Sequence, residues 1–350
     1  MFTNDKTVKV KVGKVSIGGG APVSVQSMLC VPVHDIKRNV EQAIALQNAG
    51  CEIIRVTVPN KEAIKTVEAL KSNISVPIVA DIHFDYRLAI ESVAAGVDKI
   101  RINPGNIGDD SRVKMVANAC KAAGVPIRIG VNSGSLEKHI LAKYGAATPE
   151  AIVESGLYHI SLLEKFDFGD IVLSLKSSDT ATMYKSYELA AGRCKYPLHL
   201  GVTEAGTENI GVIKSAAGIG GLLLRGIGNT IRISLTDDPV KEVEAGIKLL
   251  KAIGLRKEGI KLVSCPTCGR TEIDLIGIAK QAEERLSNIN KDITVAIMGC
   301  VVNGPGEAKA ADIGIAGGKN CGVIFKKGEI IKKLPEEKLL SALIEEIEKM

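Results

Sequence analysis

Three cysteines near the C-terminal end of the chain have the type and spacing of metal ligands. Cys265 and Cys268 form a C-x2-C pair, and Cys300 follows in the glycine-rich stretch GCVVNGPGE. Three thiolates can hold a metal and leave one coordination position for another ligand. A four-cysteine zinc ribbon would need a second C-x2-C pair, and a thioredoxin-like dithiol would leave Cys300 unexplained. The spacing leaves two interpretations open, which are a structural zinc site and a [4Fe–4S] cluster with one exchangeable iron.

A second set of reactive side chains stands at the ends of short β-branched runs. Five of them are cations, namely Arg55, Arg101, Arg128, Lys176 and Arg232. Only two carboxylates, Asp81 and Glu204, stand at comparable positions, so the predicted surplus is three positive charges. Unpaired buried charge is costly, so we expect an anionic ligand to balance it. Guanidinium groups bind phosphate oxygens in bidentate fashion, which favours a phosphate or diphosphate ester.

A repeated strand–turn–helix unit positions these side chains. Short apolar runs alternate with amphipathic helical stretches and begin at Val23, Ile53, Pro77, Asp98, Pro126, Asp170, Pro197 and Thr230. Eight such units in about 250 residues predict a (β/α)8 TIM barrel over residues 1–255, with its active site at the carboxyl ends of the strands. An open doubly wound sheet is the alternative, but no G-x-G-x-x-G opens the first helix.

The remaining residues predict a smaller α+β domain over 260–350, after the charged segment RKEG that interrupts the repeat. It contains the three cysteines and the strand-like runs ITVAIM, ADIGIA and GVIFKKG. A final helix is expected after Pro335, with one apolar face made of Leu339, Leu340, Leu343, Ile344 and Ile347. The chain is therefore predicted to have two domains, both of the α and β class.

Composition excludes several classes of protein. Of the 350 residues, 45% are hydrophobic and 24% charged, which excludes a disordered chain. No apolar run is long enough to span a bilayer, so no membrane partner is expected. Only 3% of residues are aromatic and the net charge of +5 is not clustered, which disfavours a zinc-ribbon protein that binds nucleic acid. The N-terminus lacks the apolar core of a secretory signal, so we expect a cytoplasmic protein with reduced thiols.

The cysteine motifs and the strand ends together resemble one known family. SCPTCGR and MGCVVNGPGE, placed after IIRVTVP, KIRINPGN, PIRIGVN and HLGVTEAG, closely resemble the 4-hydroxy-3-methylbut-2-en-1-yl diphosphate synthases of the non-mevalonate isoprenoid pathway. The resemblance runs from about Val15 to the end of the second domain. No large insertion separates the two domains, so the chain is similar to the compact bacterial form.

The resemblance implies a cofactor, a substrate and an electron donor. In that family three cysteines and a glutamate hold a [4Fe–4S] cluster, and the matching positions are Cys265, Cys268, Cys300 and Glu307. The implied substrate is 2-C-methyl-D-erythritol 2,4-cyclodiphosphate, and the product is 4-hydroxy-3-methylbut-2-enyl diphosphate. Two electrons are expected from reduced ferredoxin or flavodoxin. A carboxylate ligand on a soft cluster exchanges readily, which suits the iron that the substrate must reach.

Roles for the barrel residues follow from this chemistry. The five cations are expected to hold the diphosphate and to stabilise it as a leaving group. The expected hydrogen-bond partners are His83, Asn103, Asn132, His199 and Ser234. Glu204 is the candidate for proton exchange with the departing hydroxyl, and Asp81 is expected to orient His83 or an arginine.

A head-to-tail homodimer is also expected. The helix after the eighth strand returns to the barrel face opposite the active site, and the tether that follows is short. A partner's cysteine domain would close each barrel mouth more easily than the chain's own. The alternative function is a pterin-binding TIM-barrel enzyme with a structural zinc domain, which explains neither the five cations nor Glu307.

Overall fold

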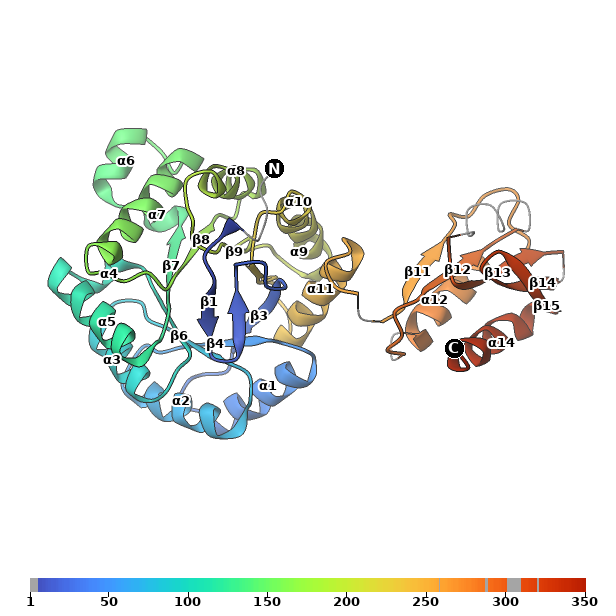
Figure 1. The fold of residues 1–350 in the computed structure, drawn as a ribbon, viewed down its shortest axis with the longest axis horizontal. Helices are drawn as coiled ribbons and strands as arrows, with labels where there is room; N and C mark the ends of the chain where they lie inside the picture. The colour runs from blue at the N-terminus through green and yellow to red at the C-terminus, as the bar shows by residue number, and fades with distance from the viewer. Residues whose placement is uncertain (1–5, 258, 287–288, 301–309, 320) are drawn as a thin grey trace. The chain divides into compact units, whose positions relative to one another are not determined.

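The computed structural model describes residues 6–257, 259–286, 289–300, 310–319 and 321–350. The chain divides into two compact units, Met1–Leu255 and Arg256–Met350. Figure 1 shows the first unit as a ring of helices around strands and the second as a small sheet with helices. No helix in the described ranges is long and apolar enough to cross a membrane.

Eight parallel strands form the barrel of the first unit. They are β3 (Ser24–Met28), β4 (Ile53–Thr57), β5 (Ile78–Asp81), β6 (Lys99–Ile102), β7 (Ile127–Asn132), β8 (Ile171–Lys176), β9 (His199–Leu200) and β10 (Thr230–Ile231). Neighbours follow the order β8-β7-β6-β5-β4-β3-β10-β9. A parallel bridge between Leu173 and Leu198 joins the two ends of this order. The predicted closed barrel is confirmed, and the open sheet is excluded.

Helices surround the strands and bury their apolar faces against them (Figure 1). They are α1 (Ile36–Asn48), α2 (Glu62–Asn73), α3 (Tyr86–Ala94), α4 (Pro104–Ile107), α5 (Asp110–Ala123), α6 (Lys138–Tyr144), α7 (Pro149–Glu164), α8 (Thr180–Ala191), α9 (Glu208–Ser215), α10 (Gly221–Leu224) and α11 (Pro239–Ala252). Side chains such as Asp109, Thr148 and Asp179 accept hydrogen bonds from the first-turn amides and fix where these helices begin.

The barrel interior is layered from apolar to polar. At the amino ends of the strands a hairpin, β1 (Val10–Val12) and β2 (Val15–Ile17), packs Val12 and Ile17 against Ile53 and Val79. Above this apolar layer the inward positions carry polar and charged residues. TIM-barrel interiors are mostly filled by branched aliphatic side chains, so a polar interior marks a binding function rather than a stability requirement.

The second unit is a five-stranded mixed sheet. Its strands follow the order β11 (Lys261–Ser264), β12 (Thr294–Met298), β13 (Ile313–Gly318), β14 (Cys321–Lys326) and β15 (Glu329–Leu334). The first three are parallel and the last two pairings are antiparallel. Two helices, α12 (Leu275–Leu286) and α14 (Glu336–Glu348), pack into its core. The five apolar residues predicted for one face of the final helix are all buried.

Candidate active site

A polar cavity of about 130 Å³ lies at the carboxyl ends of the barrel strands. Its walls are made by Arg55, His83, Arg101, Arg128, Gly130, Asn132, Ser174, Lys176, Thr203, Arg232 and Ser234. Side chains two positions apart on a strand point to the same face, so every second residue at these strand ends faces the cavity. The structure thus brings together all five cations predicted from the sequence. We call these five cations, together with the cavity that they surround, the cation cradle.

Asp81 holds two of the arginines in place. Its carboxylate is fully buried and accepts hydrogen bonds from Arg55 Nη2 and, at 3.1 Å, from Arg101 Nη1. His83 Nε2 lies 3.7 Å from the same carboxylate. Burial raises the pKa of Asp81, but the charges of Arg55 and Arg101 outweigh it and hold the pKa well below its ordinary value. Asp81 therefore stays ionised and fixes both guanidinium groups at the cavity wall.

Glu242, on α11, plays the same part for Arg232. Its carboxylate accepts hydrogen bonds from Arg232 Nη2 at 3.2 Å and Arg232 Nε at 3.3 Å. The Leu235 amide and the Ser27 hydroxyl donate to it as well, each at 3.0 Å. The sequence offered no signal for Glu242, because it lies on an outer helix and not at a strand end. The charge inventory made from the sequence therefore omitted a buried carboxylate, Glu242.

Arg128 and Lys176 have no carboxylate bonded to them among the described residues. Arg128 is 1% exposed, and its Nε and Nη1 atoms make no hydrogen bond to a described group. Burial lowers the pKa of Lys176 well below its ordinary value, and the charges of Arg232 and Arg128 lower it further. Buried donors and cations without partners are costly, so this side of the cavity is built to receive an anion.

Glycine gives the arginine side chains the room that they need. A Cβ on Gly130 would lie 2.4 Å from Arg101 Nε, and the Gly130 carbonyl accepts a hydrogen bond from Arg101 Nη2 at 3.2 Å. A Cβ on Gly201 would lie 3.1 Å from Lys176 Nζ. The cradle therefore requires a residue without a side chain at both positions. The sequence analysis did not identify either glycine, because it considered only chemically reactive side chains.

Three predicted site residues do not line the cavity. Asn103 is buried and caps α4 by accepting a hydrogen bond from the Gly105 amide at 3.2 Å. His199 is fully buried beneath the cradle, at the inward position two residues before Gly201. Glu204 is exposed and has a left-handed backbone, with φ of 51°. Such a φ is uncommon for a residue other than glycine and is often found at functional loops.

The cysteine motif lies at the carboxyl ends of adjacent strands. Cys265 follows β11 and Cys300 follows β12, and these strands are parallel neighbours, with the Cys265 amide donating to the Ile297 carbonyl at 3.2 Å. Cys268 follows in the same loop as Cys265. Among the described residues no three His, Cys, Asp or Glu side chains are gathered closely enough to hold a metal ion. Glu307, the predicted fourth ligand, lies outside the described residues.

The donor set nonetheless fits an iron–sulfur cluster. The Gly299 amide donates a hydrogen bond to Cys265 Sγ at 3.2 Å, a contact that stabilises a thiolate. A hydrogen bond from the Arg270 amide lowers the pKa of the Cys268 thiol. Thiolates are the soft ligands that iron–sulfur clusters take.

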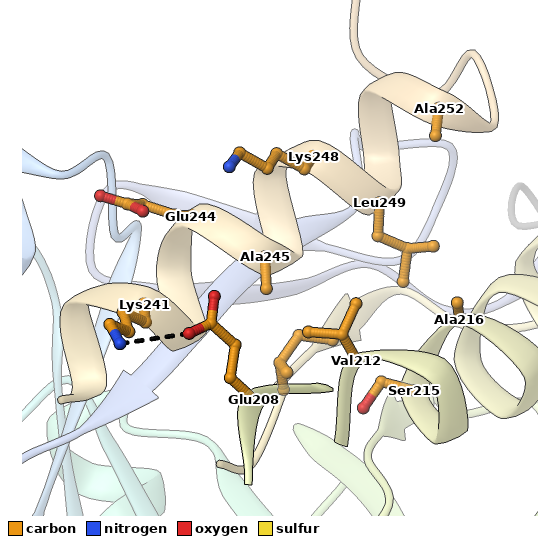
Figure 2. Close-up of a pocket in the computed structure, with 11 residues that line it drawn as sticks. Glu208, Val212, Ser215, Ala216, Lys241, Glu244, Ala245, Lys248, Leu249 and Ala252 are labelled. Atoms are coloured by element: carbon orange, nitrogen blue, oxygen red, sulfur yellow. Dashed lines mark hydrogen bonds and ion pairs between the residues drawn. The ribbon is translucent and has the colours of Figure 1, made fainter. Parts of the chain in front are cut away.

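A larger hollow, of about 350 Å³, lies on the outside of the barrel between α9 and α11. Figure 2 shows the alkyl side chains of Val212 on α9 and Leu249 on α11 extending into the space between the two helices, with the Lys241–Glu208 ion pair at one end. It lies outside the barrel between two helices, whereas the active sites of TIM barrels lie at the carboxyl ends of the strands, so the smaller polar cavity is the candidate active site.

Comparisons with known proteins agree with this assignment. Residues 7–247 match the family described as the GcpE TIM-barrel domain, and residues 261–349 match the GcpE protein C-terminal domain. A protein of Caldanaerobacter subterraneus subsp. tengcongensis is 58% identical over 344 residues, which is 98% of this chain and 97% of that protein. One of Clostridium perfringens is 58% identical over 343 residues, 98% of each chain. Both are named 4-hydroxy-3-methylbut-2-en-1-yl diphosphate synthase (flavodoxin).

Solved structures of dihydropteroate synthases share the barrel fold. That of Xanthomonas albilineans has a TM-score of 0.50 at 15% identity and covers 70% of this chain and 98% of its own. That of Stenotrophomonas maltophilia has a TM-score of 0.50 at 16% identity and covers 71% of this chain and 98% of its own. Identity this low shows the fold alone, so it gives no support to the pterin-binding alternative. The matches over both units show that the chain belongs to the family of 4-hydroxy-3-methylbut-2-en-1-yl diphosphate synthases.

Proposed function

We propose that the cation cradle binds 2-C-methyl-D-erythritol 2,4-cyclodiphosphate, which this iron–sulfur oxidoreductase converts to 4-hydroxy-3-methylbut-2-enyl diphosphate. The observation that carries the proposal is the cradle itself, in which five cations surround one cavity and two of them lack a carboxylate partner in the described structure. A cyclic diphosphate is a dianion whose oxygens suit guanidinium donors. Substrate binding would supply the counter-charge that Arg128 and Lys176 do not receive from a described carboxylate.

The cradle also acts on the bond that breaks. The ring opens at the carbon–oxygen bond, the freed diphosphate gains a negative charge, a hydroxyl leaves as water and a double bond forms. The dianion takes two electrons and one proton and yields a trianion and water, so charge balances. Arg55 and Arg101, held by Asp81, and Arg232, held by Glu242, present donors that need no rearrangement as the charge on the leaving group grows.

The uncharged groups have separate tasks. His83, Asn132 and Ser234 line the cavity, and we assign them hydrogen bonds to the substrate. Asn103 and His199 act from behind the wall, the first by fixing the loop after β6 and the second from beneath the cradle. Glu204 remains our candidate for proton exchange with the departing hydroxyl, because its strained, exposed position at the barrel rim leaves its carboxylate accessible.

We propose that Cys265, Cys268 and Cys300 hold a [4Fe–4S] cluster, with Glu307 as the fourth ligand that the family resemblance implies. When bound, such a cluster supplies electrons one at a time and a Lewis-acidic iron. The Gly299 amide donates a hydrogen bond to Cys265 Sγ, and the Arg270 amide lowers the pKa of the Cys268 thiol, which favours the thiolate that binds iron. Flavodoxin, the donor in the relatives' names, is the proposed source of electrons, with ferredoxin as the other candidate, in the cytoplasm.

Metal analysis tests the cluster. Protein purified without oxygen should be brown and contain about four iron and four sulfide per chain, and Cys300→Ser should lose most of both because serine is a poor ligand for soft iron. Cys321→Ser, a change at a cysteine outside the motif, should keep them. A colourless protein with one zinc per chain would overturn the assignment.

A binding titration tests the cradle. Arg55→Ala should weaken binding of the cyclic diphosphate by about 2–4 kcal/mol, because it removes a buried, charge-assisted contact. Arg193→Ala, an exposed arginine after α8, is the control and should bind normally. Equal affinity in the two variants would remove Arg55 from the site.

We further propose a head-to-tail homodimer in which the cysteine domain of each chain completes the partner's barrel site. In the barrel, α11 runs against the direction of β10, so its end lies at the face opposite the cradle. Its 14 residues are about 21 Å long. Residues 256–259 span at most about 14 Å, and this short tether favours a partner's cysteine domain over the chain's own as the one that completes each site.

A further inference from the structure

A buried polar layer lies directly beneath the cation cradle. Its members occupy inward positions below the cavity wall and come from β3, β6, β9 and β10: Ser24, Gln26, Lys99, His199 and Thr230. Lys99 stands two residues before Arg101 on β6, and Thr230 stands two residues before Arg232 on β10 and pairs with His199 on β9. The layer is thus continuous with the wall of the cavity.

Most polar atoms of this layer have no hydrogen-bond partner in the part of the chain that the structure describes. Lys99 Nζ, both ring nitrogens of His199, both amide atoms of Gln26 and the hydroxyls of Ser24 and Thr230 make no hydrogen bond to any described group. Lys99 and His199 are both 0% exposed. Both side chains are fully buried and have no carboxylate bonded to them among the described residues, which favours the neutral form of each in the free barrel.

The surroundings of Lys99 and His199 are positive on nearly every side. Arg55 on β4 and Arg128 on β7 act on both groups, and Lys176 on β8 acts on His199. Burial lowers the pKa of each group well below its ordinary value, and these cations lower it further. The described carboxylates on this wall, Asp81 and Glu242, are both bonded to arginines. A dianion in the cavity would offset most of this positive charge.

We propose that the buried polar layer takes up a proton when the dianionic substrate binds in the cavity above it, with Lys99 and His199 as the acceptors. The identity of the dianion rests on the proposed function, whereas the layer and its charges do not. The substrate's own phosphates remain ionised near neutral pH, because each phosphorus of a cyclic diphosphate carries a single, strongly acidic hydroxyl. Any proton taken up near neutral pH is therefore bound by the protein.

This uptake matches the balance of the reaction. The dianion needs one proton and two electrons to give the trianionic product and water. A proton bound in the layer offsets part of the substrate's charge and is already inside the barrel when the hydroxyl leaves. It can be returned to the reaction through the cavity once the electrons have been delivered, after which Lys99 and His199 are neutral again.

Calorimetry of substrate binding tests the inference. The oxidised holoenzyme is titrated with the cyclic diphosphate without a reductant, so that no turnover occurs, in buffers of different ionisation enthalpy at pH 8. A plot of the observed binding enthalpy against the ionisation enthalpy of the buffer should have a slope that corresponds to about one proton taken up. The affinity should increase up to about tenfold for each unit that the pH falls. A zero slope with clear binding would overturn the inference and leave the proposed function intact. Failure to bind the cyclic diphosphate would overturn both.

Variants identify the acceptors. Lys99→Met and His199→Gln should each reduce the slope, and Lys248→Met, an exposed lysine on α11, should leave it unchanged. His83, which faces Asp81 from the cavity wall, is the other titratable imidazole at the site. A full slope in the double variant that carries both Lys99→Met and His199→Gln would place the proton elsewhere and overturn the inference. If either variant fails to fold, the slope of the unchanged protein still decides whether a proton is taken up.

Discussion

At the scale of single residues, two buried carboxylates decide how the cradle is arranged. Asp81 bonds to Arg55 and Arg101, and Glu242 bonds to Arg232, so three guanidinium groups are fixed before any ligand arrives. Arg128 and Lys176 have no such partner among the described residues. The cradle thus contains three arginines that buried carboxylates hold in place and two cations that are available to pair with a ligand.

Asp81→Asn should destabilise the barrel, because it leaves two buried guanidinium groups without a counter-charge. We expect a loss of about 3–5 kcal/mol in the free energy of unfolding at pH 7. The pKa of Asp81 is lowered in the folded state, so its contribution is complete above its unfolded pKa of about 3.9 and is lost as the pH falls below that value. Denaturant titrations should therefore show a constant difference between the two proteins from pH 5 to 8 that shrinks at lower pH. A difference that grows toward low pH would contradict this account.

Glu242→Gln should weaken substrate binding without abolishing the fold. The amide oxygen keeps an acceptor for the Leu235 amide, and the NH2 group can donate to the Ser27 hydroxyl, but the side chain loses the charge that orients Arg232. We expect KM to rise about tenfold, equivalent to about 1.4 kcal/mol, with a smaller change in kcat. Glu244→Gln, two residues away on the exposed face of α11, serves as the matched control. Identical kinetics in both variants would show that Glu242 is only structural.

The residues that the sequence predicted follow a local strand pattern, whereas those that it missed reach the site through long-range contacts. The five cradle cations lie on barrel strands or directly after one, and the two-residue period turns all of them toward the inside of the barrel. Glu242 reaches the cradle from an outer helix, and such long-range pairing leaves no local pattern. Lys99 was predictable as an inward residue, since it shares a face with Arg101, but its full burial without a partner was not.

At the scale of elements, β7 shows how a strand makes space for function. Gly130 lies between Arg128 and Asn132, both of which line the cavity, and its missing side chain admits the Arg101 guanidinium from β6. The alternation of apolar runs and amphipathic helices predicted the barrel, because eight such units have few other ways to bury their strands. It did not predict which positions must be glycine.

Gly130→Ala should move Arg101 and weaken binding of the cyclic diphosphate by about tenfold or more, since the new methyl group would occupy the place of Arg101 Nε. Gly134→Ala is the control, because no atom lies within 4 Å of its Cβ position. Affinity is measured by titration and folding by thermal unfolding. Normal affinity in a folded Gly130→Ala protein would show that the position of Arg101 does not matter for binding.

At the scale of the whole molecule, the proposed exchange of domains between partners can be tested by mixing inactive chains. Cys300→Ser removes a proposed cluster ligand, and Arg55→Ala removes part of the cradle. In a mixed dimer with shared sites, one site carries both lesions and the other carries neither. Activity should therefore reappear, to about one quarter of the unaltered level if the chains mix at random. Mixed dimers without activity would show that each site is built within one chain.

The central claim is that this chain reduces a cyclic diphosphate held in the cation cradle, and product analysis tests it most directly. The anaerobic holoenzyme is given 2-C-methyl-D-erythritol 2,4-cyclodiphosphate and reduced flavodoxin, and the phosphorus compounds are identified. We predict that 4-hydroxy-3-methylbut-2-enyl diphosphate forms with two electrons consumed per molecule, and that Arg128→Met, which keeps the bulk but not the charge, forms almost none. Unchanged substrate in the presence of a fully loaded cluster and reduced flavodoxin would contradict the account.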